Sequence, residues 1–194
     1  VGKIPDPRMV KTVLSLENPL IEIVSEEIDA TYLEAASKLQ FHSEENKQHG
    51  KDLNIAYTSL HGTGVTIFPR LMALWGFSNI SMVDSQIMPD GDFPSVKSPN
   101  PEDESALAPG IRKLEDIQGD ILIAHDPDAD RVGIAVLHKG EAIQLNGNQI
   151  AVLCLEYICE SLTQQGKLPK NAAFIKTMVT TELFKHICDH YQKP

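Results

Sequence analysis

The sequence is poor in cysteine, in basic residues and in long apolar runs. Its 194 residues include three cysteines, an odd number without a CxxC pair, so no disulfide framework is expected and a reducing, cytoplasmic setting is favoured. Lys and Arg total 17 against 27 Asp and Glu. The resulting net charge of −10 argues against a nucleic-acid partner, whose binding normally uses a basic surface. No run approaches about 18 uninterrupted apolar residues, so no membrane span is expected.

Both ends of the chain also lack expected features. The first residues, Val-Gly-Lys-Ile-Pro, contain neither an initiating Met nor the apolar core of a signal peptide. The last residues follow a helical pattern directly, with no closing strand. We therefore expect a fragment of a longer protein.

Three segments can be distinguished along the chain. Residues 1–50 form an approach segment with a helix, which charged residues at 44–50 then end. The apolar residues at helical spacing in that segment are Ile28, Tyr32, Ala35 and Leu39. Residues 51–145 alternate short β-rich runs with helical runs, and residues 146–194 begin the same alternation again. We expect one domain over 51–145, preceded by a missing first domain, and the truncated start of a further domain over 146–194.

The alternation predicts an α/β fold made of two layered α/β domains with mostly parallel mixed sheets, the second one incomplete. In the first domain, strands are expected at 53–58, 80–83 and 120–124, followed by a hairpin of strands at 132–137 and 142–145. Helices are expected at 67–75 and 109–117, and a Pro-, Asp- and Ser-rich loop at 85–105. Loops of that length are usually functional. In the second domain, helices at 148–162 and 180–191 flank a strand at 172–176.

Three aspartates, Asp126, Asp128 and Asp130, directly follow the apolar strand at 120–124. Carboxylates this close repel one another unless a cation neutralises them. Ligands that are all oxygen favour Mg²⁺ or Ca²⁺ over Zn²⁺, and the carboxyl ends of strands are where open α/β sheets place ligands. Arg131 adds a cation that can bind a phosphate group bidentately. The sequence therefore predicts a hard-cation site beside an arginine.

Other interpretations of the aspartate cluster are less consistent with the residues. An EF-hand loop needs Gly at its sixth position and Glu at its twelfth, where this chain has Arg131 and Leu137. A haloacid-dehalogenase-like, Mg²⁺-dependent phosphatase normally has Thr where this chain has Asp130. A solvated acidic turn without function, and a metal-binding module without catalysis, are the remaining alternatives.

Two further motifs invite functional interpretations. His61-Gly-Thr-Gly64 separates a strand from a helix, which suits a phosphate site, but such a turn more often allows close backbone packing. His186 and His190 stand four residues apart on a predicted helix, with no third metal ligand nearby. We interpret the two histidines as an exposed helix end.

The Asp-Pro-Asp-Ala-Asp-Arg run at 126–131 stands in a fixed order with three other motifs. They are Tyr-Thr-Ser-Leu-His-Gly-Thr-Gly at 57–64, Pro-Asp-Gly-Asp-Phe-Pro-Ser-Val-Lys-Ser-Pro-Asn-Pro-Glu at 89–102, and Lys-Thr-Met-Val-Thr-Thr at 176–181. On these four motifs the chain resembles the α-D-phosphohexomutase family, the phosphoglucomutases and phosphomannomutases. Pro127, where most of the family has Gly, is typical of the longer phosphopentomutase-like branch.

The resemblance implies a function and a role for each matching residue. Members of the family interconvert sugar 1-phosphates with 6-phosphates, or with 5-phosphates for pentoses, through a phosphoserine and a sugar bisphosphate intermediate. By resemblance, Asp126, Asp128 and Asp130 would hold Mg²⁺ against that phosphoserine, and Arg131 would face the phosphoryl group. Lys176 matches a lysine proposed as an acid/base group or substrate contact, although it could also be a solvated lysine at a strand end.

Several family segments are absent from this sequence. The serine segment of the first domain, the loop that recognises the sugar and the phosphate-binding loop of the fourth domain have no counterpart. Domains 1 and 4 of the same polypeptide are therefore the expected partners, together with a sugar phosphate. We expect the chain to be inactive by itself.

Overall fold

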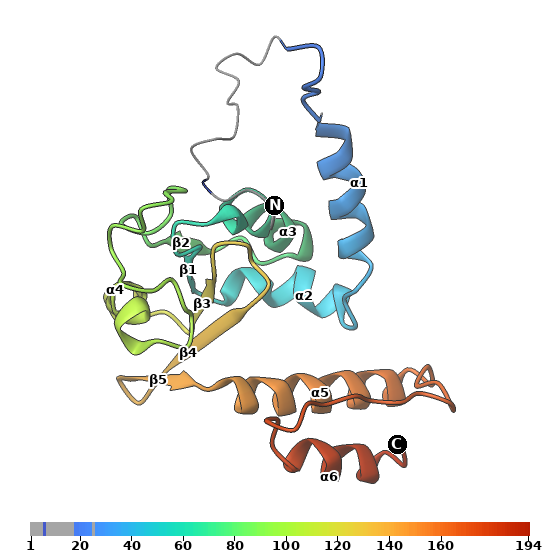
Figure 1. Cartoon of the computed structure of the whole chain (residues 1–194). Coiled ribbons are helices and arrows are strands. Elements are labelled where there is room, and N and C mark those ends of the chain that lie inside the picture. The colour runs from blue at the N-terminus through green and yellow to red at the C-terminus, as the bar shows by residue number, and fades with distance from the viewer. Residues whose placement is uncertain (1–5, 7–17, 25) are drawn as a thin grey trace.

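The computed structural model describes residue 6, residues 18–24 and residues 26–194 (Figure 1). Its helices are α1 (Glu26–Ser37), α2 (Ser43–His49), α3 (Phe68–Trp75), α4 (Glu104–Asp116), α5 (Gly147–Gln164) and α6 (Leu183–His190), with short 3-10 helices η2 (Gly50–Asp52) and η3 (Thr63–Val65). Its strands are β1 (Ile55–Thr58), β2 (Ile80–Met82), β3 (Ile121–His125), β4 (Val132–His138) and β5 (Glu141–Leu145). Among the described helices, none has both the length and the apolar character needed to cross a bilayer.

One five-stranded sheet, in the order β2-β1-β3-β4-β5, organises the residues between 55 and 145. β1 pairs in parallel with both β2 and β3, whereas β3-β4 and β4-β5 are antiparallel pairs. The α/β class and the mixed sheet are thus confirmed, as are the five strands expected in this part of the chain. Parallel and antiparallel pairings are equally numerous, because the 132–145 hairpin continues the sheet beyond β3.

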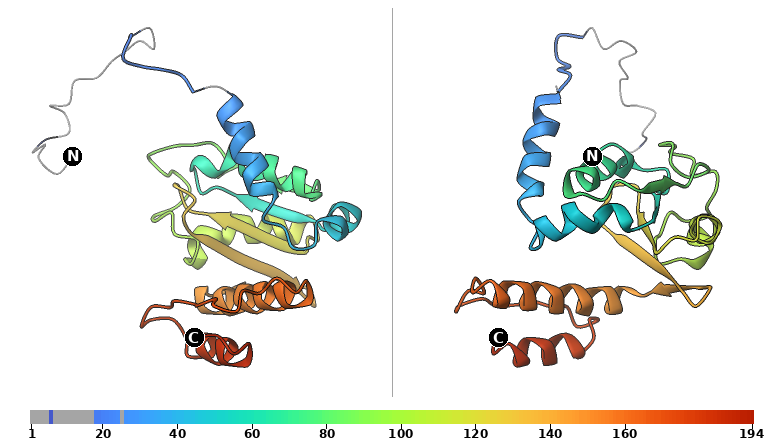
Figure 2. Two further views of the ribbon diagram at one scale, coloured as in Figure 1. Left: turned by 90° about the vertical axis from the view of Figure 1, so that its right-hand side faces the viewer. Right: turned by 180° about the vertical axis from the view of Figure 1, so that it is seen from behind.

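Helices cover both faces of this sheet (Figures 1 and 2). On one face, α4 packs against the small and aliphatic side chains of the central strands. This core comprises Ala56, Leu107, Leu114, Leu122, Ala124 and Ala135. On the opposite face, Tyr57 stacks on Phe68 at the start of α3, with ring centroids 4.3 Å apart. Successive residues of a strand point to opposite faces, and because both faces are covered all four residues of β1 are buried.

Helix ends follow the local chemistry of the sequence. α3 ends at Gly76, whose φ of 100° is the left-handed conformation that glycine adopts readily at a helix C-terminus. α4 begins after Asp103, whose carboxylate accepts a hydrogen bond from the Ser105 N–H at 2.8 Å. α5 begins with a capping box between Asn146 and Gln149.

The first fifty residues differ from the sequence expectation in two ways. Residues 43–49 form the helix α2 rather than a break, and their charges complement its dipole, with acidic residues in the first turn and basic residues in the last. The helix expected around residues 28–39 is present as α1, but Leu33 and Ala36 are its buried residues. The predicted apolar positions Ile28, Tyr32, Ala35 and Leu39 are exposed. Arg70 of α3 holds α1 in this orientation by ion pairs with Glu26 and Asp29.

The helices α5 and α6 form a separate layer beside the sheet (Figures 1 and 2). They pack through a small core of Leu155, Cys159 and Cys188, with Phe174, Phe184, Ile187 and Tyr191 against it. All three cysteines are free; Cys159 and Cys188 are buried, whereas Cys154 is exposed. The prediction of a strand at 172–176 is wrong, because no segment of the described residues pairs with it. A strand requires a hydrogen-bonded neighbour, and its apolar sequence alone does not supply one.

Candidate metal centre

The aspartate cluster lies in the turn that joins β3 to β4, a turn called the Asp loop hereafter (residues 126–131). The loop closes on itself, because the Ala129 N–H donates to the Asp126 carbonyl at 3.0 Å and the Asp126 N–H to the Arg131 carbonyl at 3.4 Å. Ala129 has a φ of 59°, in the left-handed region that is uncommon for non-glycine residues. The turn therefore has a defined shape imposed by its own hydrogen bonds and by the two strands that it joins.

Three carboxylates meet in this loop. One carboxylate oxygen each from Asp126, Asp128 and Asp130 lies within 4.8 Å of the other two. Asp126 is buried at 2% exposure, whereas the other two are exposed to solvent. Across the described part of the chain this is the one such group of His, Cys, Asp or Glu residues. An oxygen-only donor set with one anchored and two accessible carboxylates fits a hard divalent cation that keeps some of its water ligands.

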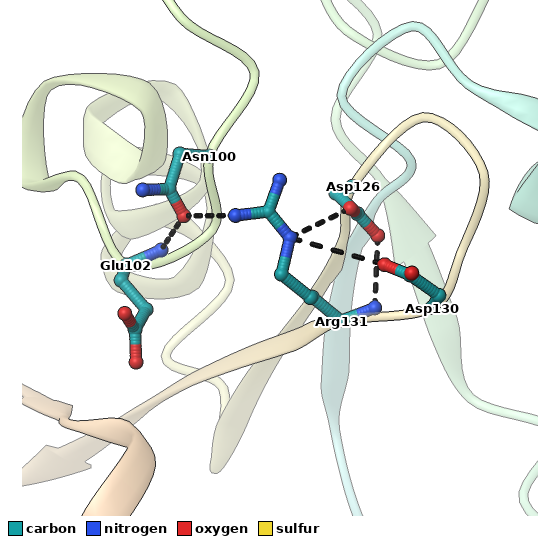
Figure 3. A network of polar contacts seen from close by, with 5 residues as sticks. All are labelled: Asn100, Glu102, Asp126, Asp130 and Arg131. Carbon is teal, nitrogen blue, oxygen red and sulfur yellow. Dashed lines mark hydrogen bonds and ion pairs between the residues drawn. The ribbon is translucent and has the colours of Figure 1, made fainter. Parts of the chain in front are cut away.

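Arg131 holds the buried carboxylate in place (Figure 3). Its backbone N–H donates to Asp126 Oδ1 at 2.9 Å, and its Nε donates to Asp126 Oδ2 at 2.8 Å. Asp130 Oδ1 lies 3.9 Å from the same Nε. On its other side, Arg131 Nη1 donates to Asn100 Oδ1 at 3.3 Å. The guanidinium is thus fixed between two acceptors from different segments while 55% of its side chain stays exposed.

Two carboxylates of the loop, Asp126 and Asp130, have pKa values shifted in opposite directions. Burial by itself would raise the pKa of Asp126, but hydrogen bonds from the backbone N–H and guanidinium of Arg131 outweigh burial and lower it. The pKa of Asp130 is raised, first by the charge of Asp128 and then by that of Asp126. Repulsion between exposed carboxylates is therefore only partly relieved by Arg131, and a bound cation would relieve it further.

The turn at His61–Gly64 packs directly on the Asp loop. A Cβ on Gly62 would lie 2.2 Å from Pro127 Cα, so only glycine allows this approach. The Thr63 N–H donates to the Pro127 carbonyl at 2.8 Å, and the Thr63 hydroxyl donates to the same oxygen at 3.1 Å. Close backbone packing, the interpretation favoured from the sequence, is what the structure shows.

Lys176 lies apart from these contacts, in the segment between α5 and α6. Its Nζ donates to Glu182 Oε1 at 2.8 Å and to the Thr180 carbonyl at 3.2 Å. The pKa of Glu182 is lowered by its hydrogen bond with this lysine. The structure thus brings Arg131 and the three aspartates together and gives Lys176 a separate anionic partner.

Two residues that the sequence left without a role complete the surroundings of Arg131. Asn100 Oδ1 accepts hydrogen bonds from both Arg131 and the backbone N–H of Glu102 (Figure 3). Glu102 in turn reaches the start of α5, where its carboxylate accepts from the Gly147 N–H at 3.1 Å. Both belong to the Pro-Asn-Pro-Glu end of the long loop. Their position in this motif was the feature of the sequence that could have marked them as functional residues. Their contact with residue 131, however, depends on the fold.

Comparisons with known proteins agree with this architecture. The family model for phosphoglucomutase/phosphomannomutase, alpha/beta/alpha domain II, matches residues 30–140, more than half of the chain. This chain belongs to the phosphoglucomutase/phosphomannomutase family. Family membership confirms the resemblance drawn from the four motifs.

Relatives within the family cover the same region. A phosphoglucomutase of Staphylococcus haemolyticus is 35% identical over 142 residues, which are 73% of this chain and 25% of the relative. A phosphoglucomutase of Staphylococcus aureus is 39% identical over 137 residues, 70% of this chain and 24% of the relative. The chain therefore spans about a quarter of the length of the relatives it matches.

A solved structure shares the fold. A phosphoglucomutase/phosphomannomutase family protein from Burkholderia thailandensis matches with a TM-score of 0.53 at 20% sequence identity, over 71% of this chain and 26% of that one. At this identity the match supports the α/β architecture alone.

Proposed function

We propose that this chain supplies the metal-binding part of a sugar-phosphate mutase, with Mg²⁺ held by Asp126, Asp128 and Asp130. The observation that carries the proposal is the approach of three carboxylates to within 4.8 Å at the end of β3, in a chain of this family. Oxygen-only ligands favour Mg²⁺, and its site in phosphoryl-transfer enzymes is usually completed by water and phosphate oxygens. Family membership favours this function over a phosphatase or a metal-binding module without catalysis.

In this proposal Arg131 contacts the transferred phosphoryl group. Its Nε and Nη1 are engaged by Asp126 and Asn100, which fixes the plane of the guanidinium. The exposed remainder of the group can donate to phosphate oxygens in a fixed orientation. A bound Mg²⁺ would neutralise negative charge on the same phosphate oxygens. Phosphoryl transfer depends mostly on positioning the reacting groups and on neutralising this charge.

Lys176 is proposed as an acid/base group or substrate contact of the same reaction. Its ammonium is held by Glu182 and by a backbone carbonyl, so it offers a positioned charge. An ammonium has three N–H groups and these two partners use two of them, so the third could donate to a sugar phosphate.

The complete reaction needs groups outside this sequence. We propose that residues 51–145 are the second domain of the mutase and residues 146–194 the start of its third, with residues 1–50 following the first domain. Domains 1 and 4 of the same polypeptide would supply the phosphoserine and the remaining phosphate contacts. A sugar bisphosphate would serve as intermediate and activator, and hexose or pentose phosphates are the substrates. The cytoplasmic setting stays a prediction.

The proposal is tested with the longest protein that contains this chain. Conversion of glucose, mannose and pentose 1-phosphates would be followed side by side, with Mg²⁺ and after its removal by a chelator. We expect turnover of at least one substrate, lost on chelation and in an Asp128→Asn variant whose exposed position spares the fold. Full activity of that variant would refute the assignment of the loop as the metal site.

A further inference from the structure

The turn that enters the His61–Gly64 motif is conformationally strained. Leu60 has a φ of 45° and His61 a φ of 64°, so two consecutive non-glycine residues occupy the left-handed region. This conformation is unfavourable for a residue that has a Cβ, and a bulky side chain such as that of Leu60 is rarely found there. Strain of this kind persists only where surrounding contacts impose it, and it concentrates at functional sites.

His61 supplies the contacts that impose the strained conformation. The residue is 6% exposed. Its backbone N–H donates to the Gln86 carbonyl at 2.8 Å, and its carbonyl accepts from the Asp90 N–H at 3.0 Å. Its ring nitrogens also have partners, with Nδ1 3.1 Å from the Met88 carbonyl and Nε2 2.8 Å from Ser95 Oγ. Four hydrogen bonds thus tie one residue to the long loop.

The chemistry of these partners defines what the imidazole ring does. The Met88 carbonyl can only accept, so Nδ1 carries a hydrogen and donates to it. With Nδ1 as the donor, Nε2 can accept from the Ser95 hydroxyl. The side chain acts as a rigid bridge between two points of the long loop, and both of its polar atoms are used.

The other side of the same turn rests on the Asp loop. Gly62 lies in contact with the backbone of Pro127, and Thr63 donates two hydrogen bonds to the Pro127 carbonyl. Pro127 stands between the first two proposed metal ligands in the sequence. The backbone at residues 60–63 is therefore held by the long loop on one side and braces the Asp loop on the other.

We propose that His61 is a positioning residue for the Asp loop. Its four hydrogen bonds hold the left-handed turn, and the turn places Gly62 and Thr63 against Pro127, so that the carboxylates on either side of Pro127 converge. His61 itself contacts neither metal nor substrate in this proposal. The inference rests on the proposed metal site, but the geometry of the Asp loop can also be followed without metal.

The test measures loop geometry and Mg²⁺ affinity on the 194-residue chain. Backbone amide NMR spectra without metal should show shifted or broadened signals for residues 126–131 in His61→Ala. Calorimetric titration should show an Mg²⁺ dissociation constant raised about tenfold, the lower range for loss of a residue that supports metal ligands. His61→Asn should restore most of the affinity, since Asn tolerates the left-handed conformation and keeps a donor.

Two controls separate positioning from general stability. Leu114→Ala removes a buried side chain of the α4 core, so it should lower the melting temperature while leaving the amides of 126–131 and the Mg²⁺ affinity unchanged. His61→Ala removes the two ring hydrogen bonds and keeps the two backbone ones, so Ser95→Ala, which removes one ring bond, should have a smaller effect. If the amide signals of residues 126–131 are unchanged in a folded His61→Ala variant, the inference is overturned, whatever its Mg²⁺ affinity. Absence of Mg²⁺ binding by the wild-type chain, with the amide shifts present, would instead count against the metal site alone.

Discussion

The sheet region at 51–145 and the helical region at 146–194 place their polar groups in different ways. In the sheet region, Arg131 donates hydrogen bonds both to Asp126 of its own loop and to Asn100, which lies 31 positions earlier in the chain. In the helical region, Lys176 is held by residues four and six positions away. Nearby Met178 is 95% exposed. The paired strands of the sheet fix the positions of Arg131 and its partners, whereas Lys176 is held by local contacts alone and can rearrange more easily.

The largest expected difference between the two regions is in metal binding. Asp126→Ala removes the anchored carboxylate, so the Mg²⁺ dissociation constant should rise at least about 100-fold, the upper range for residues that merely support a ligand. Lys176→Met should leave it unchanged, since the partners of Lys176 are Glu182 and the Thr180 carbonyl. Calorimetric titration of both variants makes the comparison. An equal loss in both would show that the two regions form one site.

Core truncation should reveal how independently the regions unfold. Leu122→Ala in β3 should cost about 2–5 kcal/mol, because Leu122 is fully buried in the α4 core. Leu155→Ala should fall near the low end of that range, since its cluster is smaller. Amide hydrogen exchange should show the second variant losing protection in α5 and α6 while β1 and β3 keep theirs. Uniform loss of protection across the sheet would mean that the regions unfold as one unit.

A smaller effect is expected at the junction of the regions. Asn146 caps α5, and its side chain accepts from the Gln149 N–H at 3.0 Å. Asn146→Ala should therefore reduce the free energy of unfolding by about 1 kcal/mol, as cap removal usually does. Gln164→Ala, at the exposed end of the same helix, is the matched control and should have little effect. Denaturant unfolding followed by circular dichroism compares them, and equal costs would contradict the capping role.

The smallest expected effect concerns pH and the cap of α4 in the sheet region. Hydrogen bonds from the Ser105 hydroxyl and backbone N–H lower the pKa of Asp103 below its ordinary value of 3.8. A carboxylate whose pKa is lower in the folded state stabilises that state above the unfolded pKa, and the contribution disappears as pH falls through the folded pKa. Asp103→Asn should therefore be slightly less stable than wild type at pH 7, and the difference should shrink as the pH falls below 3.8. A stability difference that persists at low pH would exclude the charge as its cause.

Most of the sheet region could be read from its sequence. The apolar runs at 53–58 and 120–124 are buried strands, and the hairpin at 132–145 is formed as expected. Prediction failed where the outcome depended on partners. Residues 172–176 carry a strand-like sequence without a neighbouring strand in the described structure. The apolar positions predicted to line one face of the first helix are exposed, and Leu33 and Ala36 are buried instead. The contact between Asn100 and Arg131 also joins segments that no local pattern connects.

The sequence by itself determined the class of fold, the family and the identity of the three carboxylates, because these depend on residue types in a local order. Only the tertiary structure decided which carboxylate is anchored, that Arg131 lies between Asp126 and Asn100, and that Gly62 supports Pro127. The contact of Gly62 with Pro127 follows from strand pairing between β1 and β3, which brings residues more than sixty positions apart into contact. Local sequence preferences determine which segments form helices and strands, whereas burial and hydrogen bonding across the sheet determine which side chains come into contact.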